Sequence, residues 1–417
     1  MADGQVSKPS LIERPPRPLF GIRRLRRDFG SLYAANALIG VVFSATGPVA
    51  VILTVGTQGG LSSAELASWI FGVFFLNGVL TVLASWLYHQ PLAMFWTIPG
   101  TVLLGPALGH LAWPEVIGAF FATGLLILLL GLTGWVRRIM GVIPMPIVMA
   151  MVAAVFLRFG IELVRALGGN IAIAAPMVLV FFGLSAWPLG ARWIPPIIGA
   201  LVVGAAAVAV SGQFGPVPAL GQWIAAPLFQ SPQWSAQALI ELVVPLAITV
   251  LVVQNGQGIA VLRNAGHNAP INAITIACGV WSILVACVGG VSTCLTGPTN
   301  ALLSASGERS RHYVAGICCG LLAMLFGLFA PVFTQLMLAT PAAFIAVLAG
   351  LAMLRVLQSA FVAAFSTRFT LGALVTFVVT IADITVLNIG AAFWGLIAGI
   401  LVSLLLERED YAARRSG

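Results

Sequence analysis

Three side-chain amides, Gln254, Asn255 and Gln257, interrupt an otherwise apolar stretch at residues 236–260. A buried amide without a hydrogen-bond partner costs roughly 2–7 kcal/mol in an apolar medium. We therefore expect these amides to face the interior of the protein and not lipid. There they would donate hydrogen bonds to the oxygen atoms of a bound solute, foremost at Gln254. The alternative is that they hold neighbouring helices together.

Two other apolar stretches contain Pro-Gly or Gly-Pro signals. Residues 89–109 read HQPLAMFWTIPGTVLLGPALG, and residues 291–307 read VSTCLTGPTNALLSASG. Each predicts a short extended run followed by a helix of about ten residues, because Pro is tolerated at the first helical position. Such a helix is too short for a bilayer, which needs roughly 20 residues. A matched pair of broken segments indicates the binding site of a secondary transporter; two ordinary loops are the alternative.

The starts of the two short helices would present unpaired N–H groups and about half a positive charge each, which favours an anion. Phe95 and Trp96 would form an aromatic wall or pack in the core. An unwinding expected at 44–48 would bring Ser44 and Thr46 to the same cavity, unless these hydroxyls bond their own backbone. The remaining candidates contact the ligand or cap the helices: Thr97, Gly100, Thr101, Thr296, Gly297, Thr299 and Asn300.

Two carboxylic acids fall within or near predicted helices, and an acid inside the membrane is a functional candidate. Asp383 is the most deeply placed, and Glu241 lies near the outer end of its helix. Each is a candidate for proton coupling, with a position at the water interface as the alternative. The five cysteines and four histidines have no metal-ligand spacing. We expect no metal, no cofactor and no enzymatic activity.

The composition assigns the chain to the membrane. Of 417 residues, 60% are hydrophobic and 8% charged, and the mean hydropathy is +1.06. The apolar stretches run continuously for about 20 residues, which predicts helices and not barrel strands. The N-terminal stretch lacks the apolar core of a signal peptide. The net charge of +8 lies in tails and short loops, which is typical of a membrane protein and not of a nucleic-acid surface.

The predicted fold is an all-α polytopic membrane protein with about 14 segments in a 7+7 inverted repeat, of which the third and tenth are the broken strand-helix segments. Basic residues place both termini in the cytoplasm of a bacterial-type inner membrane. Arg158 and Arg165 fall on the outer side with Glu162 between them, and Arg355 lies toward the inner end of its helix. The other basic residues, including Arg137, Arg138 and Arg192, fall inside.

The expected parts are a basic cytosolic tail at 1–30, a first repeat at 31–211, an extracytoplasmic connection at 212–235, a second repeat at 236–406 and a cytosolic tail at 407–417. The unbroken segments of the first repeat are predicted at 31–54, 64–88, 113–136, 141–160, 170–188 and 193–211. Those of the second are predicted at 236–260, 271–289, 312–336, 341–359, 369–387 and 389–406.

Three motifs together resemble the benzoate/proton symporter family: QPLAMFWTIPGTVLLG at 90–105, VVQNGQGIAVLRNAGHNAPIN at 252–272 and STCLTGPTNALL at 292–303. That family is distantly related to nucleobase-ascorbate and sulfate permeases. The resemblance implies a core domain from 31–138 and 236–338, and a gate domain from 139–211 and 339–406. The nucleobase relatives have acidic residues at positions matching Gln254 and Thr296. Neutral groups there fit an anionic substrate.

We therefore expect import of benzoate or a related aromatic carboxylate with protons, by alternating access. The expected partners are this small carboxylate, protons and membrane lipid, with no nucleic acid. A homodimer is one expectation for the oligomeric state. The alternatives are a nucleobase or inorganic-anion permease of the same fold, and a channel-like or scaffolding membrane protein.

Overall fold

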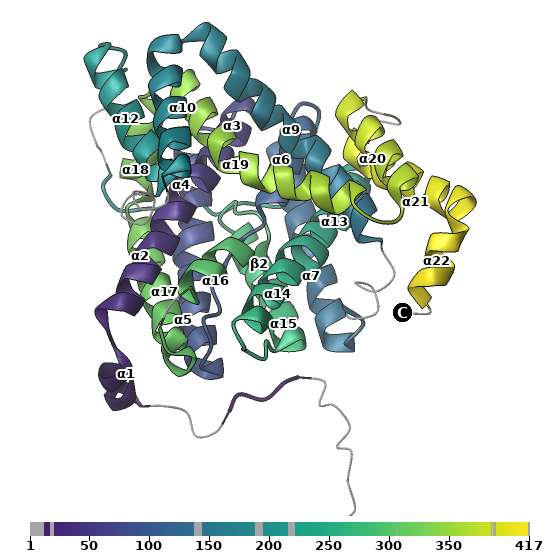
Figure 1. Cartoon of the computed structure of the whole chain (residues 1–417), viewed down its shortest axis with the longest axis horizontal. Coiled ribbons are helices and arrows are strands. Elements are labelled where there is room, and N and C mark those ends of the chain that lie inside the picture. Colours follow the sequence, from purple (N-terminus) through teal and green to yellow (C-terminus); the bar gives the residue numbers. More distant parts are fainter. Residues whose placement is uncertain are drawn as a thin grey trace, which may run out of the picture.

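The structure is a computed structural model that describes residues 12–16, 21–136, 144–187, 195–215, 222–305, 307–384, 386 and 389–415. Within these residues seven helices are long and apolar enough to cross a membrane, and six shorter apolar helices of 10–17 residues lie among them. The chain is therefore a mostly helical, multi-span membrane protein (Figure 1).

The elements of the first half are α1 (Ile22–Asp28), α2 (Ser31–Ala45), α3 (Gly47–Gln58), α4 (Ser63–Phe71), the π-helical η1 (Gly72–Leu76), α5 (Asn77–Tyr88), β1 (Met94–Trp96), α6 (Ile98–Ala107), α7 (Trp113–Thr133), α9 (Met145–Gly169), α10 (Ile171–Ala186) and α12 (Pro196–Val210). Those of the second half are α13 (Ala236–Ile248), the π-helical η2 (Thr249–Asn255), α14 (Gly256–Asn264), α15 (Ile271–Ala286), β2 (Thr293–Leu295), α16 (Gly297–Leu303), the short 3-10 turn η3 (Arg309–Arg311), α17 (His312–Leu328), α18 (Ala330–Leu338), α19 (Ala342–Phe365), α20 (Thr370–Ala382), α21 (Ala391–Leu406) and α22 (Arg408–Arg415).

The first span is broken where the sequence predicts it. Helix α2 ends at Ala45, and Thr46 has non-helical backbone angles (φ −97°, ψ −93°). Pro48 then occupies the first turn of α3, where its missing N–H removes no helical hydrogen bond. The unwinding expected at 44–48 is confirmed.

Two helices are longer than predicted. The expected end of a helix at residue 160 is wrong, because α9 continues to Gly169 and contains Arg158, Glu162 and Arg165. Leu, Glu, Arg and Ala are good helix formers, and the Arg165–Glu162 pair (2.7 Å) supports the last turns. The predictions for Arg137, Arg138 and Arg192 lie outside the described residues.

Helix α19 likewise runs to Phe365 and not to residue 359, with no Gly or Pro to end it earlier. Arg355 therefore lies ten residues before the end of α19 and thirteen after its start at Ala342. The prediction that this arginine lies toward the inner end of its helix is wrong, since it is close to the middle.

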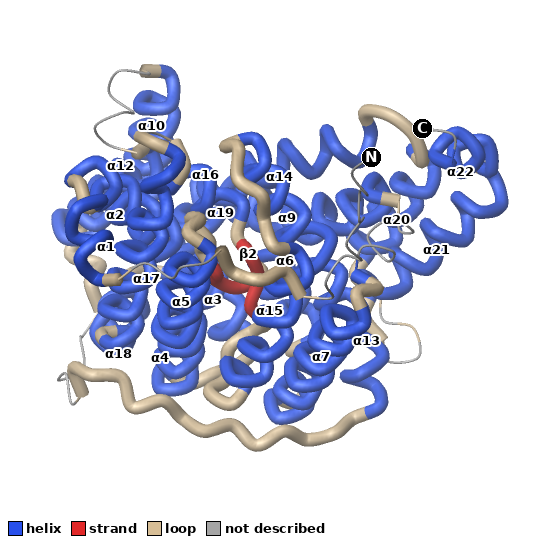
Figure 2. The backbone as a smooth tube through the Cα atoms, turned by 90° about the horizontal axis from the view of Figure 1, so that it is seen from below, coloured by secondary structure: helices blue, strands red, loops and turns tan. Residues whose placement is uncertain are grey.

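The two strands lie at the centre of the molecule, surrounded by helices (Figure 2). They pair antiparallel, with Met94 opposite Leu295, Phe95 opposite Cys294 and Trp96 opposite Thr293. Pairing satisfies backbone groups that would otherwise be unbonded at this depth. Both broken segments are thus extended and then helical, as the sequence predicts.

The helices form two groups. The first bundle contains α2 to α7 and α13 to α18, held together mainly by α15 against α7 and by α17 against α5 and α2. The second bundle contains α9, α10, α12 and α19 to α21, in which α9 packs most extensively against α19. Figure 1 shows the second bundle above the strands, from α12 and α10 at the upper left to α20 and α21 at the right.

Residues 222–235, between α12 and α13, cross one end of the first bundle, along the lower edge of Figure 2. Backbone hydrogen bonds join Ala225 to Leu328 (2.8 Å), Gln230 to Cys287 (2.8 Å) and Gln233 to Pro114 (2.8 Å). Ser68 Oγ accepts a hydrogen bond from the Leu228 amide (2.9 Å). This connection therefore caps the ends of α4, α7, α15 and α17.

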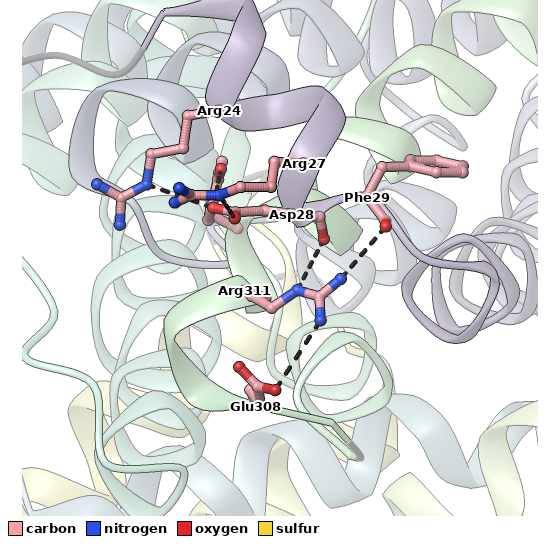
Figure 3. A network of polar contacts seen from close by, with 7 residues as sticks. Arg24, Arg27, Asp28, Phe29, Glu308 and Arg311 are labelled. Atoms are coloured by element: carbon pink, nitrogen blue, oxygen red, sulfur yellow. Dashed lines mark hydrogen bonds and ion pairs between the residues drawn. The ribbon is translucent and has the colours of Figure 1, made fainter.

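A polar network fixes α1 to the turn before α17 (Figure 3). Arg311 donates to the carbonyls of Asp28 (2.8 Å) and Phe29 (3.2 Å), and Tyr313 donates to the Asp28 carboxylate (2.9 Å). Burial raises the pKa of Asp28, but hydrogen bonds from Tyr313 and two arginines outweigh burial and hold this pKa below 3.8. The carboxylate thus stays ionised where the N-terminal helix docks.

Candidate functional site

The broken segments are held together by each other's backbone. The Thr97 amide donates to the Ser292 carbonyl (3.1 Å), and the Thr296 amide donates to the Ala93 carbonyl (3.2 Å). Asn300 binds the residue before β1, because its Oδ1 accepts from the Ala93 amide (2.9 Å) and its Nδ2 donates to the Ala93 carbonyl (3.1 Å). These bonds fix the start of α6 relative to the start of α16.

Most of the predicted hydroxyl groups, and the side-chain amide of Asn255, form hydrogen bonds within the protein. Thr97 Oγ1 caps α6 at the Gly100 amide (3.1 Å), while Thr101 bonds the Thr97 carbonyl (3.0 Å). Asn255 Oδ1 accepts from the Leu295 amide (2.7 Å) and ties η2 to β2.

Ser44 Oγ lies 3.2 Å from Thr299 Oγ1 and joins α2 to α16. Thr46 Oγ1 donates to the carbonyls of Val42 (2.9 Å) and Phe43 (3.1 Å) in the last turn of α2. Thr296 is buried and has no side-chain capping bond. None of these four residues lines the cavity described below.

The two predicted glycines allow close packing. A Cβ on Gly100 would meet Leu246 at 3.0 Å and Thr249 Oγ1 at 3.1 Å. A Cβ on Gly297 would meet Gln257 Cγ at 2.5 Å and Oε1 at 2.8 Å. The Gln257 side chain therefore lies directly across the first residue of α16.

Phe95 and Trp96 pack inside the first bundle. Both are almost fully buried, and Phe74 lies between them, with ring centroids 5.5 Å from Phe95 and 5.2 Å from Trp96. Neither residue lines the cavity. The aromatic residues that do line it come from other helices: Phe43, Phe156 and Phe181.

A cavity of about 840 Å³ separates the two bundles. Both broken segments reach it, through Ile98 and Pro99 at the start of α6 and Pro298 at the start of α16. Its wall is mainly apolar, and the volume falls in the range of roughly 300–1,000 Å³ typical of small-molecule sites. The polar side chains on the wall are Ser185, Gln254, Gln257, Arg355 and Ser359.

Gln254 is buried on this wall, in the π-helical turn η2. Its Oε1 has no hydrogen-bond partner among the described residues. Rotation of the amide by half a turn would put the Nε2 atom, with its two N–H donors, where Oε1 now lies. A π-helical turn inside an α-helix frequently occurs at functional sites. Gln254 and Gln257 are thus the predicted residues that the structure brings to the cavity.

Arg355 is a residue of this wall that the sequence analysis did not single out. The signal was present, because a single arginine inside a long apolar stretch is a functional candidate. Because the sequence predicts that this helix ends at residue 359, Arg355 is expected near a helix end. An arginine there has an ordinary role at the membrane interface.

The same bundles meet tightly at the other end of their interface. A small pocket of about 30 Å³ is lined there by Arg158, Glu241, Asp383 and Gly390. Glu241 is buried and lies 2.9 Å from His110 Nε2, and Arg158 lies 2.5 Å from Asp383. The two predicted acids are therefore brought together, but far along the helices from the cavity.

A multi-span protein with paired broken segments beside a cavity between two helix bundles has the design of a secondary transporter. The sequence matches the benzoate membrane transport protein family over residues 30–405, and the chain belongs to this family of membrane transporters.

Two relatives match nearly the whole chain. The inner membrane protein YdcO of Escherichia coli is 30% identical over 382 residues, which are 90% of this chain and 95% of that protein. A benzoate membrane transport protein of Acinetobacter baylyi is 28% identical over 391 residues, 92% of this chain and 98% of that protein.

Solved structures share the fold. The transmembrane domain of the cyanobacterial bicarbonate transporter BicA has a TM-score of 0.60 at 14% identity and covers 93% of this chain and all of that chain. The inward-facing murine solute carrier 26 family member A9, an anion transporter, also has a TM-score of 0.60 at 14% identity, with 90% of this chain and 68% of that chain covered. At this identity the likeness concerns the fold alone.

Proposed function

We propose that the protein imports benzoate or a related aromatic carboxylate together with protons across a bacterial inner membrane. The observation that carries the proposal is the cavity of about 840 Å³, whose wall is apolar apart from five polar side chains. An aromatic ring is apolar on both faces and needs such a wall. An aromatic carboxylate has a pKa of about 4, so it arrives at neutral pH as an anion.

The two ends of such a substrate have different partners on this wall. Phe43, Phe156 and Phe181 offer aromatic contacts to the ring. The amides of Gln254 and Gln257 and the starts of the two short helices favour the carboxylate. A nucleobase would need donors and acceptors along its whole edge, and an inorganic anion would leave most of the apolar wall without contact.

Transport follows from movement of one bundle against the other. In this proposal the first bundle is the core domain, the second is the gate domain, and about 14 segments form a 7+7 inverted repeat. In this proposal the cavity of about 840 Å³ opens to one side of the membrane, and the pocket of about 30 Å³ is the closed gate toward the other. Separation of the bundles at the pocket, with closure at the cavity, would expose the substrate to the opposite side.

We place both termini and the mouth of the cavity in the cytoplasm, because the arginine-rich α1 and the α22 arginines fit the inner side. The connection at 212–235 would then be extracytoplasmic. A Gln230→Cys variant without the native cysteines should react with a membrane-impermeant thiol reagent in intact cells. Labelling only after the cells are opened would reverse the orientation.

The transport proposal is tested with purified protein in proteoliposomes. Benzoate uptake should rise when the outside is made acidic, and an uncoupler should abolish the accumulation. Unlabelled benzoate should compete, whereas uracil and sulfate should not. Competition by uracil or sulfate in place of benzoate would support the alternative permease, and uptake without response to the proton gradient would remove proton coupling.

A further inference from the structure

Arg355 is the only charged side chain among the described residues that line the 840 Å³ cavity. It lies near the middle of α19, one helical turn after Ala352. Ala352 in turn packs against Gly47, which follows the break in the first span. The Arg355 side chain is exposed and lies on the cavity wall, one turn from the contact with the start of α3.

The guanidinium group of Arg355 is largely unpaired. In the described part of the chain its side chain makes one hydrogen bond, from Nη1 to Gln358 Oε1 (3.2 Å), and no ion pair. Arginine has five N–H donors in a planar fork. Elsewhere Arg158 pairs with Asp383, and Arg165 pairs with Glu162. Because the exposed guanidinium lies on the cavity wall with most of its donors free, its place there points to an anionic ligand.

The opposite wall supplies neutral donors to the same ligand. Gln254 and Gln257 come from the first bundle, whereas Arg355 comes from the second. We propose that Arg355 determines the specificity of the transporter by pairing with the substrate carboxylate, an inference that rests on the proposed function. The planar fork can bind both carboxylate oxygens. A neutral compound of the same shape would not form this pair and would bind more weakly than the carboxylate.

This pairing also gives the substrate a position between the bundles. The carboxylate would contact Arg355 on one side and the amides on the other, and the ring would fill the apolar remainder. Removal of the charge should therefore weaken carboxylates selectively, without a matching effect on neutral analogues.

The experiment measures binding of radiolabelled benzoate, and its displacement by benzamide, to purified wild-type protein and three variants. Arg355→Gln should weaken benzoate binding about 10- to 100-fold, because hydrogen bonds to charged groups are lost. The benzoate affinity of Arg355→Lys should lie between those of the wild type and Arg355→Gln, since the ammonium keeps the charge without the planar fork. Benzamide affinity should be nearly the same in all proteins. Arg368→Gln removes an exposed charge outside the cavity and is the matched control.

Wild-type affinity for benzoate in Arg355→Gln would overturn the inference while the proposed function stands. Equal losses for benzoate and benzamide would also overturn it, since they would indicate a structural role. If the wild-type protein itself binds no aromatic carboxylate, the proposed function falls and takes the inference with it. The inference is supported only when benzoate is weakened and benzamide is not.

Discussion

The two ends of the interface between the bundles have opposite characters. At one end the bundles are apart, around a cavity of about 840 Å³ with an unpaired arginine. At the other they touch around a pocket of about 30 Å³, and the ionisable groups are paired: His110 with Glu241 and Arg158 with Asp383. Where the interface is closed, ionisable side chains pair with one another. Where it is open, a ligand would take the partner's place.

Helices α6 and α9 and the span from α13 to α14 line both ends, whereas α19 lines only the cavity and α20 and α21 line only the pocket. Pro99 of α6 faces the cavity and Pro106 faces the pocket. Gln254 and Glu241 are 13 residues apart on one span, or ~20 Å at 1.5 Å per residue. A tilt of one bundle would therefore open one end as it closes the other.

The largest effect is expected from a side chain forced into the closed end. Gly390 precedes α21, and a Cβ there would lie 2.5 Å from Glu241 Oε1. Gly390→Val should hold α21 away from α13, and overpacking of about 1–3 kcal/mol would shift the two-state balance roughly 5- to 150-fold. Uptake should fall accordingly, and Ala392→Cys, at the pocket, should react faster with an impermeant thiol reagent.

The matched control is Gly183→Val in α10, because a Cβ on Gly183 meets nothing within 4 Å. It adds the same side chain to a helix surface and should leave both uptake and labelling unchanged. Unchanged labelling at Ala392→Cys in the Gly390→Val protein would contradict the idea that this pocket is a closed gate.

The broken segments could be predicted from the sequence because their signals are local. Pro and Gly fix backbone geometry within a few residues, so the extended runs, the short helices and the break near Thr46 follow from the sequence. The sequence predicts the ends of α9 and α19 too early, because polar residues such as Arg158 are typical of the connections between membrane helices. Within a protein interior such residues can remain helical when a partner helix covers them.

The partners that a side chain contacts are harder to predict from the sequence than whether the side chain is buried. The sequence indicates that Asn255 is a buried amide and places Asn300 at a helix start, but their partners are backbone groups far away in the sequence, at Leu295 and Ala93. Phe95 and Trp96 lie on strand β1, and their contact with Phe74 depends on where α4 and η1 pack. Only the assembled bundles determine that Phe156 of α9 lines the cavity.

At the open end, a negative charge on Gln254 should work against the ligand. Gln254→Glu should weaken benzoate binding about 10- to 100-fold, since the carboxylate would repel the substrate and compete for Arg355. Gln254→Ala removes one neutral hydrogen bond and should cost roughly 2- to 10-fold. Equilibrium binding at neutral pH checks both. An equal effect of the two substitutions would mean that the amide does not face the carboxylate.

The smallest effect is expected at the acids of the closed end, where one substitution should separate accumulation from exchange. Glu241 is buried and paired with His110, whereas the Asp383 side chain is 46% exposed and paired with Arg158. If Glu241 carries the coupled proton, Glu241→Gln keeps the hydrogen-bonding shape but cannot gain or lose a proton. Accumulation of benzoate under an imposed pH gradient should then fall several-fold, while exchange of labelled for unlabelled benzoate, which needs no net proton movement, should continue. Asp383→Asn removes only a partly exposed ion pair, of about 0–1 kcal/mol, and should leave both processes close to wild type. Normal accumulation by Glu241→Gln would exclude this acid as the carrier, and the proton would then have to travel with the substrate itself.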